Sequence, residues 1–385
     1  MKTTLRYCIL AGFLSAILFQ IACKKTPTDK VQGGPKFSLD SFDAHLRSSM
    51  EPAGAIGWGY AISLNGLFVK GNAYGKSRND ADGNLAFTLN KKVNIASVTK
   101  FLTAIAVLQL LERRGLDETS KIGQWLPPSW NQGPGVNNLT FGHLLGHTSG
   151  LSSANAQFTK TLGYTGLRLC IDTGVINTQT YLYRNANFAL FRILIPSLWR
   201  GLNDAPTISA ALDSATTENN YILYMQQHVF EPIGLNNISC EPESRGTSTL
   251  YYATTDLQAN NGAYYGSWTS TAGGGGFFMT VMELARVMAY YKHTEVLLSK
   301  ESRKLMEDNR YGLDRLDPAR EIHGNYYGKN GSISSSIGQG TLEQVVSFPN
   351  GIEIVVMFNT QGMVFAGGTT DPQNAIYDAY NKSWY

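Results

Sequence analysis

Asn-Gly pairs lie between apolar runs near both ends of this 385-residue chain. Asn65-Gly66 separates two such runs, and Asn350-Gly351 precedes the run IEIVVMF at 352–358. An Asn-Gly pair in this setting is the strongest short-range signal for a β-hairpin. The run at 352–358 is apolar on both faces, which predicts a strand inside a sheet that is covered on both sides. We therefore expect the two chain ends to share one antiparallel sheet.

The middle of the chain has a different pattern, in which strand signals are sparse and helical periodicity dominates. Helices are predicted at Leu39–Met50, Val98–Arg114, Phe141–Leu145, Ala189–Trp199 and Tyr221–Phe230, and another after the glycine run 273–276. The predicted fold class is α+β (mixed). It has an antiparallel sheet built from both chain ends, flanked by helices, with an inserted, mostly helical region and the site between the two parts.

Composition narrows the function classes. The chain is 43% hydrophobic and 16% charged, which allows a large buried core. Its formal charge of +3 is small for this length, and no Lys/Arg cluster interleaves with aromatic residues. Both observations argue against a nucleic-acid partner.

The first residues have the pattern of an export signal. Lys2 and Arg6 precede an apolar stretch that is too short to span a bilayer stably, and Ala22-Cys23 follows it. This resembles a bacterial lipoprotein signal, residues 1–22, in which cleavage leaves Cys23 to carry lipid. Gln20 stands where that pattern usually has Leu, so cleavage by an ordinary signal peptidase is the open alternative.

Residues 23–36 are polar and rich in Gly and Pro, as in a flexible tether. We expect an exported protein of the bacterial cell envelope, anchored to a membrane through lipid on Cys23. The folded domain would be 37–385, with a sheet lobe from about 37–95 and 310–385 and a helical lobe from about 96–309.

Cysteine and histidine give no metal signature. Cys170 and Cys240 remain in the folded body, and the sequence is equally compatible with a disulfide or with two buried thiols. His143 and His147 are four apart, but no third ligand stands near them, which favours packed or capping roles. We expect neither a metal nor a cofactor.

Ser97-Val98-Thr99-Lys100 begins the helix-patterned run that ends at Arg114. Residues three apart share one helix face, so the Lys100 amine can reach the Ser97 hydroxyl. The helix N-terminus also offers free N–H groups and the positive end of a dipole, which favour a serine oxygen that carries negative charge. The pair is therefore a candidate nucleophile with its activating amine. A plain helix start with a solvated lysine is the common alternative for this motif alone.

Two further motifs follow downstream, although the chain contains no Gly-x-Ser-x-Gly. Tyr183-Arg184-Asn185 precedes an apolar helix, and Lys329-Asn330-Gly331-Ser332 precedes the C-terminal hairpin. Tyr181 is an alternative phenol, but Tyr183 is the tyrosine with an Asn two positions later. Taken alone, Tyr183 would be interpreted as a core aromatic, Asn185 as a turn residue and Lys329 as a solvated lysine.

With Ser-x-x-Lys, Tyr-x-Asn and Lys-x-Gly in this order, the chain resembles serine β-lactamases, penicillin-binding D-alanyl peptidases and related esterases. The branch it resembles is the class C-like one, which uses Tyr-x-Asn. Segments such as NIASVTKFLTAIAVLQLLERRGLD and LTFGHLLGHTSGL also read like that family. The resemblance extends from about Leu39 to the C-terminus and implies a β-lactamase/transpeptidase-like fold.

The resemblance implies an acyl-serine hydrolase that cleaves an amide, a β-lactam or an ester through a covalent acyl-enzyme. Ser97 would be the nucleophile, and Lys100 and Tyr183 the acid/base pair. Asn185 would orient the substrate's amide. The substrate would be a small molecule or a peptidoglycan-type peptide.

In the third motif, Lys329 would bind substrate, and Gly331 would let the strand approach it closely. The N–H groups of Ser97 and Ser332 would form the oxyanion hole. Where branches that bind a substrate carboxylate usually have Thr or Ser, this chain has Asn330. Preference for a β-lactam or a D-Ala-D-Ala peptide therefore stays open. The alternative function is a penicillin-sensing or peptidoglycan-binding module that acylates without turnover.

Overall fold

The structure is a computed structural model that describes residues 35–151, 163–176, 180–254, 261–315 and 318–385. The signal peptide expected at 1–22, Cys23 and nearly all of the tether lie outside these ranges. Among the described residues, no helix has both the length and the apolar character needed to cross a bilayer.

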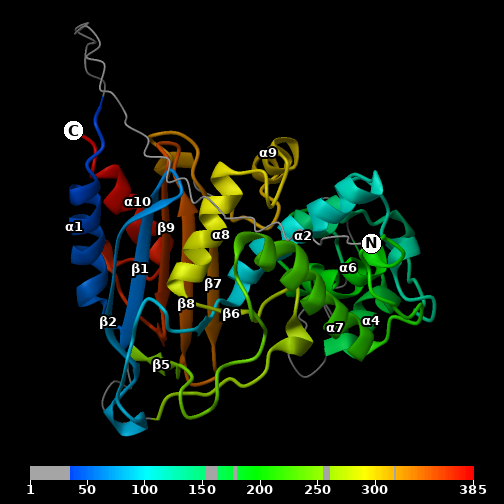
Figure 1. Ribbon diagram of the computed structural model, residues 1–385, viewed down its shortest axis with the longest axis horizontal. Helices are drawn as coiled ribbons and strands as arrows, with labels where there is room; N and C mark the ends of the chain where they lie inside the picture. Colours follow the sequence, from blue (N-terminus) through cyan, green and yellow to red (C-terminus); the bar gives the residue numbers. More distant parts are fainter. Residues whose placement is uncertain (1–34, 152–162, 177–179, 255–260, 316–317) are drawn as a thin grey trace, which may run out of the picture.

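Both expected hairpins form and belong to one eight-stranded sheet of the described residues, with the order β10-β5-β8-β9-β1-β2-β3 and with β7 also paired to β8 (Figure 1). All pairings are antiparallel except that of β10 with β5. The strands are β1 Gly57–Leu64, β2 Leu67–Arg78, β3 Leu85–Ala86, β5 Tyr252–Ala253, β7 Tyr327–Ser334, β8 Gly340–Ser347, β9 Ile352–Phe358 and β10 Thr360–Gln361.

The two Asn-Gly turns differ in length. Asn65 and Gly66 both have positive φ and form a two-residue loop between β1 and β2. In the second hairpin, Phe348 N–H donates to the carbonyl of Ile352 at 2.8 Å, and Gly351 has φ +81°. The second loop thus has three residues between Phe348 and Ile352, and both loops reverse the chain as the sequence predicts.

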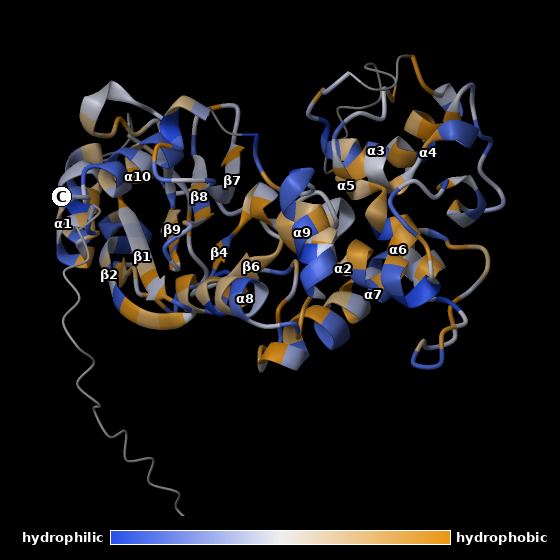
Figure 2. Ribbon diagram, turned by 90° about the horizontal axis from the view of Figure 1, so that it is seen from above, coloured by the Kyte–Doolittle hydropathy of each residue, from blue (hydrophilic) through white to orange (hydrophobic). Residues whose placement is uncertain are grey.

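Helices cover both faces of the sheet. Helices α1 (Leu39–Met50) and α10 (Pro372–Asn381) pack on the face formed by side chains such as Trp58 and Phe358. Helix α8 (Val281–His293) packs on the opposite face, in a second core that contains Met357. The view from above shows these layers (Figure 2). Every residue of β9 is buried, as its two-faced apolar pattern predicts.

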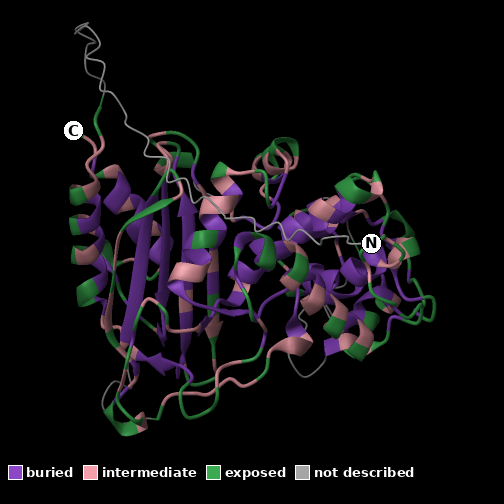
Figure 3. Ribbon diagram, in the orientation of Figure 1, coloured by how far each residue is buried: buried purple, intermediate pink, exposed green. Residues whose placement is uncertain are grey.

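The remaining helices form a second part of the molecule beside the sheet (Figures 1 and 3). They are α2 Thr99–Arg114, α3 Phe141–Leu145, α4 Gly163–Thr173, α5 Asn185–Ala189, α6 Phe191–Trp199, α7 Ser214–Met225, which continues as a π-helical turn at Gln226–Phe230, and α9 Lys300–Asp308. Helix α2 is buried over most of its length because it is apolar around its circumference. It ends where Gly115 adopts φ +63°.

The predicted fold class is confirmed: an antiparallel sheet from both chain ends, flanked by helices, with an inserted, mostly helical region. Two elements of the inserted segment attach to the sheet. Strand β5 extends its edge, and α8 covers one face. The lobe boundaries assigned from the sequence remain a prediction.

Candidate active site

A sharp turn presents Ser97 at the start of α2. Strand β4 (Val93–Asn94) pairs with β6 (Phe278–Met279) and leads into a 3₁₀ turn at Ala96–Val98. Ala96 has φ +46°, a conformation that non-glycine residues rarely adopt. The side chain of Asn94 accepts a hydrogen bond from Ala96 N–H at 2.9 Å and supports this turn. The serine therefore stands at a fixed point beside the pocket.

Lys100 lies one helical turn below Ser97 and is completely buried. Its Nζ donates to Ser97 Oγ at 3.0 Å, to Asn185 Oδ1 at 2.9 Å and to the carbonyl of Gly274 at 2.5 Å. These acceptors match the three N–H groups of an ammonium. Burial lowers the pKa of Lys100, and the neighbouring Tyr183 opposes that shift. The amine is thus held in contact with the serine and loses its own proton at a lower pH than a free lysine.

Tyr183 reaches the same oxygen from the other side, and its Oη donates to Ser97 Oγ at 2.9 Å. Burial would raise the pKa of Tyr183, but the ammonium groups of Lys100 and Lys329 outweigh burial and lower it. Their Nζ atoms lie 5.1 and 5.5 Å from the centre of the phenol ring. Tyr181, the alternative phenol, instead stacks under Arg315, whose Cζ is 3.9 Å from its ring centre.

His147 holds the segment that carries Tyr183. Its carbonyl accepts from Leu182 N–H at 2.8 Å, and its Nδ1 accepts from Arg184 N–H at 3.2 Å. The imidazole packs on Tyr183 with ring centres 4.4 Å apart. Burial, aided by the positive charge of Lys100, lowers the pKa of His147 to about 2. The ring therefore stays neutral, so Nδ1 remains an acceptor.

The packed and capping roles expected for the two histidines are confirmed. His147 is buried, and His143 takes part in the capping box at the start of α3 with Thr140. The described residues contain no group of three or more His, Cys, Asp or Glu side chains placed to hold a metal ion. No local pattern in the sequence indicates that His147 supports the segment of Tyr183, because that contact joins separate segments of the chain.

Lys329 lies on β7, on the sheet side of the pocket, and is only 2% exposed. Its Nζ donates to Asp314 Oδ1 at 2.5 Å and to Asn330 Oδ1 at 3.0 Å. Asp314 Oδ2 accepts from Asn330 N–H at 2.6 Å. Burial would lower the pKa of Lys329, but the carboxylate of Asp314 outweighs burial and raises it. Sequence reasoning missed Asp314, which lies in no motif and reaches Lys329 only through the fold.

Gly331 permits β7 to lie against the serine turn. A Cβ at this position would stand 2.6 Å from the carbonyl oxygen of Ile95, 2.6 Å from Glu343 Oε2 and 3.2 Å from Ala96 Cβ. The carboxyl of Glu343 is completely buried beneath this contact, and burial raises its pKa well above the ordinary value. The close approach is to the serine turn, and the approach to a substrate expected of Gly331 remains a prediction. Glu343 was also missed by the sequence analysis.

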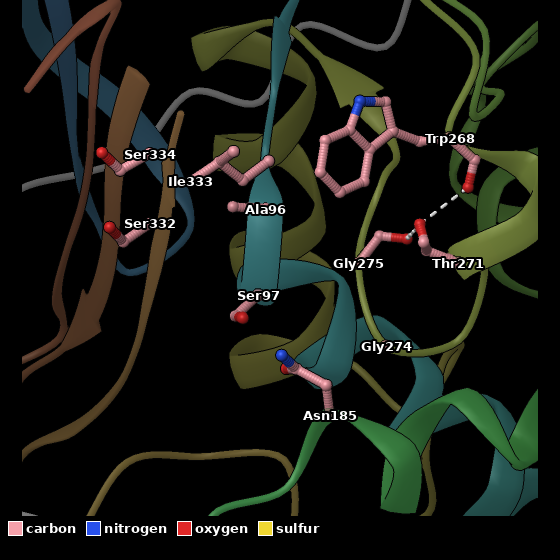
Figure 4. A pocket seen from close by; sticks show the side chains of 10 residues that line it. All are labelled: Ala96, Ser97, Asn185, Trp268, Thr271, Gly274, Gly275, Ser332, Ile333 and Ser334. Atoms are coloured by element: carbon pink, nitrogen blue, oxygen red, sulfur yellow. Dashed lines mark hydrogen bonds between the residues drawn. The ribbon is translucent and has the colours of Figure 1, made fainter. Parts of the chain in front are cut away.

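A pocket of about 310 Å³ opens beside Ser97 (Figure 4). One wall is β7, with Ser332 and Ile333, and the opposite wall carries Trp268 and the glycine run. The glycine run is a tight backbone passage, because a Cβ on Gly273 would lie 2.6 Å from the carbonyl oxygen of Phe188. Asn185 lies at the base of the pocket, beneath Ser97 in the view of Figure 4.

The structure therefore brings Ser97, Lys100, Tyr183 and Asn185 into direct contact, and it places Ser332 on the wall of the same pocket. Lys329 and Asn330 contact each other and Asp314 next to this group. Cys23 lies outside the described residues.

Residues 42–195 match the family model described as Beta-lactamase. A comparison with curated protein sequences found no match. Solved structures with a similar fold include an octameric penicillin-binding protein homologue from Pyrococcus abyssi, with a TM-score of 0.66 and 18% identity over 88% of this chain and 76% of that chain.

Two further solved structures match this chain over nearly the whole of their own length. A beta-lactamase/D-alanine carboxypeptidase from Pseudomonas syringae has a TM-score of 0.64 and 14% identity, over 89% of this chain and 98% of that chain. A D-amino acid amidase from Ochrobactrum anthropi SV3 has a TM-score of 0.64 and 16% identity, over 89% of this chain and 99% of that chain. At such identities the likeness establishes the fold.

Proposed function

We propose that this chain, of which residues 42–195 match the Beta-lactamase family model, is a serine hydrolase that works through a covalent acyl-enzyme. One observation carries the proposal. Ser97 Oγ lies 3.0 Å from an amine and 2.9 Å from a phenol whose pKa values are both lowered. A hydroxyl in contact with two such groups is equipped to lose its proton and attack a carbonyl.

In the acylation step, Ser97 Oγ bonds to the carbonyl carbon, and its proton passes to the pair formed by Tyr183 and Lys100. The tetrahedral intermediate then collapses and the bond to the leaving group breaks. Tyr183 returns the proton to the leaving nitrogen or oxygen. Water attacks the acyl-serine in the second step, with the same pair as base. The lowered pKa of Tyr183 lets a phenolate form at a lower pH than in free tyrosine.

Substrate binding follows from the pocket walls. The N–H groups of Ser97 and Ser332 are the proposed oxyanion donors, each worth about 3 kcal/mol in the transition state. The side-chain amide of Asn185 can bond a substrate amide or ester beside the serine. The reaction class is hydrolysis of an amide, a β-lactam or an ester. A carboxypeptidase and an amidase among proteins of this fold support that range.

The proposed location is the bacterial cell envelope, with the enzyme exported and held to a membrane by lipid on Cys23. The apolar N-terminal stretch before Ala22-Cys23 supports this proposal. Expression of the full chain with a Cys23→Ala variant tests it. The wild type should partition with membranes and the variant should not, whereas equal partitioning would contradict lipidation.

The nucleophile assignment is tested with a fluorophosphonate probe. Ser97→Ala should abolish covalent labelling and hydrolysis of a p-nitrophenyl ester while leaving the melting temperature nearly unchanged. Ser334→Ala, which alters another serine of the pocket wall, is the matched control and should label like the wild type. Labelling that persists in Ser97→Ala would contradict the assignment. A stoichiometric burst without turnover would indicate the alternative, an acylating sensor.

A further inference from the structure

We propose that this site selects substrates whose acyl part is uncharged, and that Asp314 is the specificity-determining residue that excludes carboxylates. The inference rests on the proposed hydrolase function and deepens it by naming the substrate class. It follows from the contacts that the positively charged side chains of the site already make.

The charge of Lys329 is already balanced. Its ammonium contacts the carboxylate of Asp314 at 2.5 Å and is 2% exposed. Asp314 also accepts from the backbone N–H of Asn330 at 2.6 Å, which fixes the carboxylate beside the strand. An anionic substrate would have to displace a charge-assisted contact that the fold has already made. The pair therefore presents no net positive charge to a ligand.

Lys100 is not available either. It is completely buried, and its hydrogen bonds go to Ser97, Asn185 and the carbonyl of Gly274. An ammonium with three hydrogen-bond acceptors has no N–H group left for a carboxylate. Its positive charge acts on the serine and on Tyr183 instead.

The walls of the pocket are uncharged. They are formed by alanine, serine, threonine, asparagine, glycine, isoleucine and tryptophan, with Ile333 and Trp268 facing each other across the space. A carboxylate that entered this space would lose water without gaining a cation, which is strongly unfavourable. An uncharged apolar acyl chain would instead bury its surface against Ile333 and Trp268.

Arg184 directly follows Tyr183 in the chain, and Arg315 is a further described cation near this group. It is exposed, and its guanidinium lies over the ring of Tyr181 at 3.9 Å. It is therefore an exposed, competing binding point for an anion. The experiment includes it for that reason.

Two esters that differ in one charge test the inference: p-nitrophenyl methyl adipate and p-nitrophenyl hydrogen adipate, measured at pH 6.5 with non-enzymatic hydrolysis subtracted. We expect the wild type to have a kcat/KM at least about 10-fold higher for the methyl ester. Asp314→Asn keeps the shape of the side chain but removes the balancing charge. This variant should lower the ratio of kcat/KM for the methyl ester to kcat/KM for the anionic ester at least about 5-fold, mainly by lowering the KM of the anionic ester.

Asp80→Asn, an exposed carboxylate at the end of β2, is the matched control and should leave the ratio unchanged. Arg315→Ala should also leave it unchanged. A wild-type preference for the anion, or a ratio that Asp314→Asn does not alter, would overturn the inference. An anion preference lost in Arg315→Ala would assign recognition to that residue instead.

The wild-type ratio is informative even if Asp314→Asn does not fold, which a melting curve would show. If the proposed hydrolase function is wrong, the result is different: neither ester is hydrolysed in a way that depends on Ser97.

Discussion

The phenol oxygen of Tyr183 lies 2.9 Å from the hydroxyl oxygen of Ser97, although 86 positions separate the two residues. The contact closes a group in which Lys100 bonds the same hydroxyl from beneath. Two groups that can exchange a proton with the serine hydroxyl are therefore in contact with it. Each has a pKa shifted toward the range in which proton transfer is useful.

Replacing Tyr183 by Phe removes the phenol but keeps the ring that packs on His147. We expect kcat for a p-nitrophenyl ester to fall by about 10²- to 10⁴-fold, the usual contribution of a general acid or base. Tyr181→Phe is the control and should retain most activity, because that side chain contacts Arg315 instead. Comparable losses of kcat in both variants would contradict the assignment of Tyr183 as the acid/base phenol.

Lys329 should contribute to the pH at which the site becomes active. Its ammonium lowers the pKa of Tyr183, so Lys329→Met should raise that pKa and move the acid limb of the pH profile of kcat/KM to higher pH, by about one unit. Lys329→Arg keeps the charge and should restore much of the wild-type profile. Measurements of kcat/KM from pH 5 to 10 for the wild type and both variants test this expectation. An unshifted limb in Lys329→Met would exclude this electrostatic role.

His147 should make the fold sensitive to acid. Its folded-state pKa is about 2, below the value of 6.5 for an unperturbed histidine, so the unfolded chain takes up a proton first as the pH falls below 6.5. The stability contribution is complete above pH 6.5 and is lost below it. Urea unfolding at pH 7 and pH 5 measures the loss. In His147→Gln the loss should be smaller by up to about 2 kcal/mol. An identical loss in both proteins would contradict the assignment.

Gly331→Ala tests the close approach of β7 to the serine turn. The added methyl would meet Glu343 and the carbonyl oxygen of Ile95 at 2.6 Å, so the strand or the turn must move. We expect a loss of about 1–3 kcal/mol in unfolding free energy and a larger fall in kcat than in substrate affinity. Gly246→Ala, where a Cβ has no neighbour within 4 Å, is the control. Wild-type kcat in Gly331→Ala would show that the contact is unimportant for chemistry.

Local patterns in the sequence identified much of the fold. The two Asn-Gly turns predicted both hairpins, because a turn's conformation depends on the residues within it. The apolar run at 352–358 predicted a buried strand, and the run after Ser97 predicted α2. The pairing of Ser97 with Lys100 was also readable, since a helix brings residues three apart together.

Other parts of the site were decided by tertiary structure alone. Asp314 neutralises Lys329, His147 supports Tyr183 and Glu343 lies under Gly331, yet no local pattern in the sequence indicates any of these contacts. Each contact depends on how the chain folds: Gly331 meets Glu343 through the pairing of β7 with β8, and His147 meets Tyr183 within the helical region. The sequence by itself therefore determined which groups could react, through local spacing and residue chemistry. Only the packing of distant segments decided which charges are balanced and which remain for a substrate, because Coulomb energies depend on distance in space.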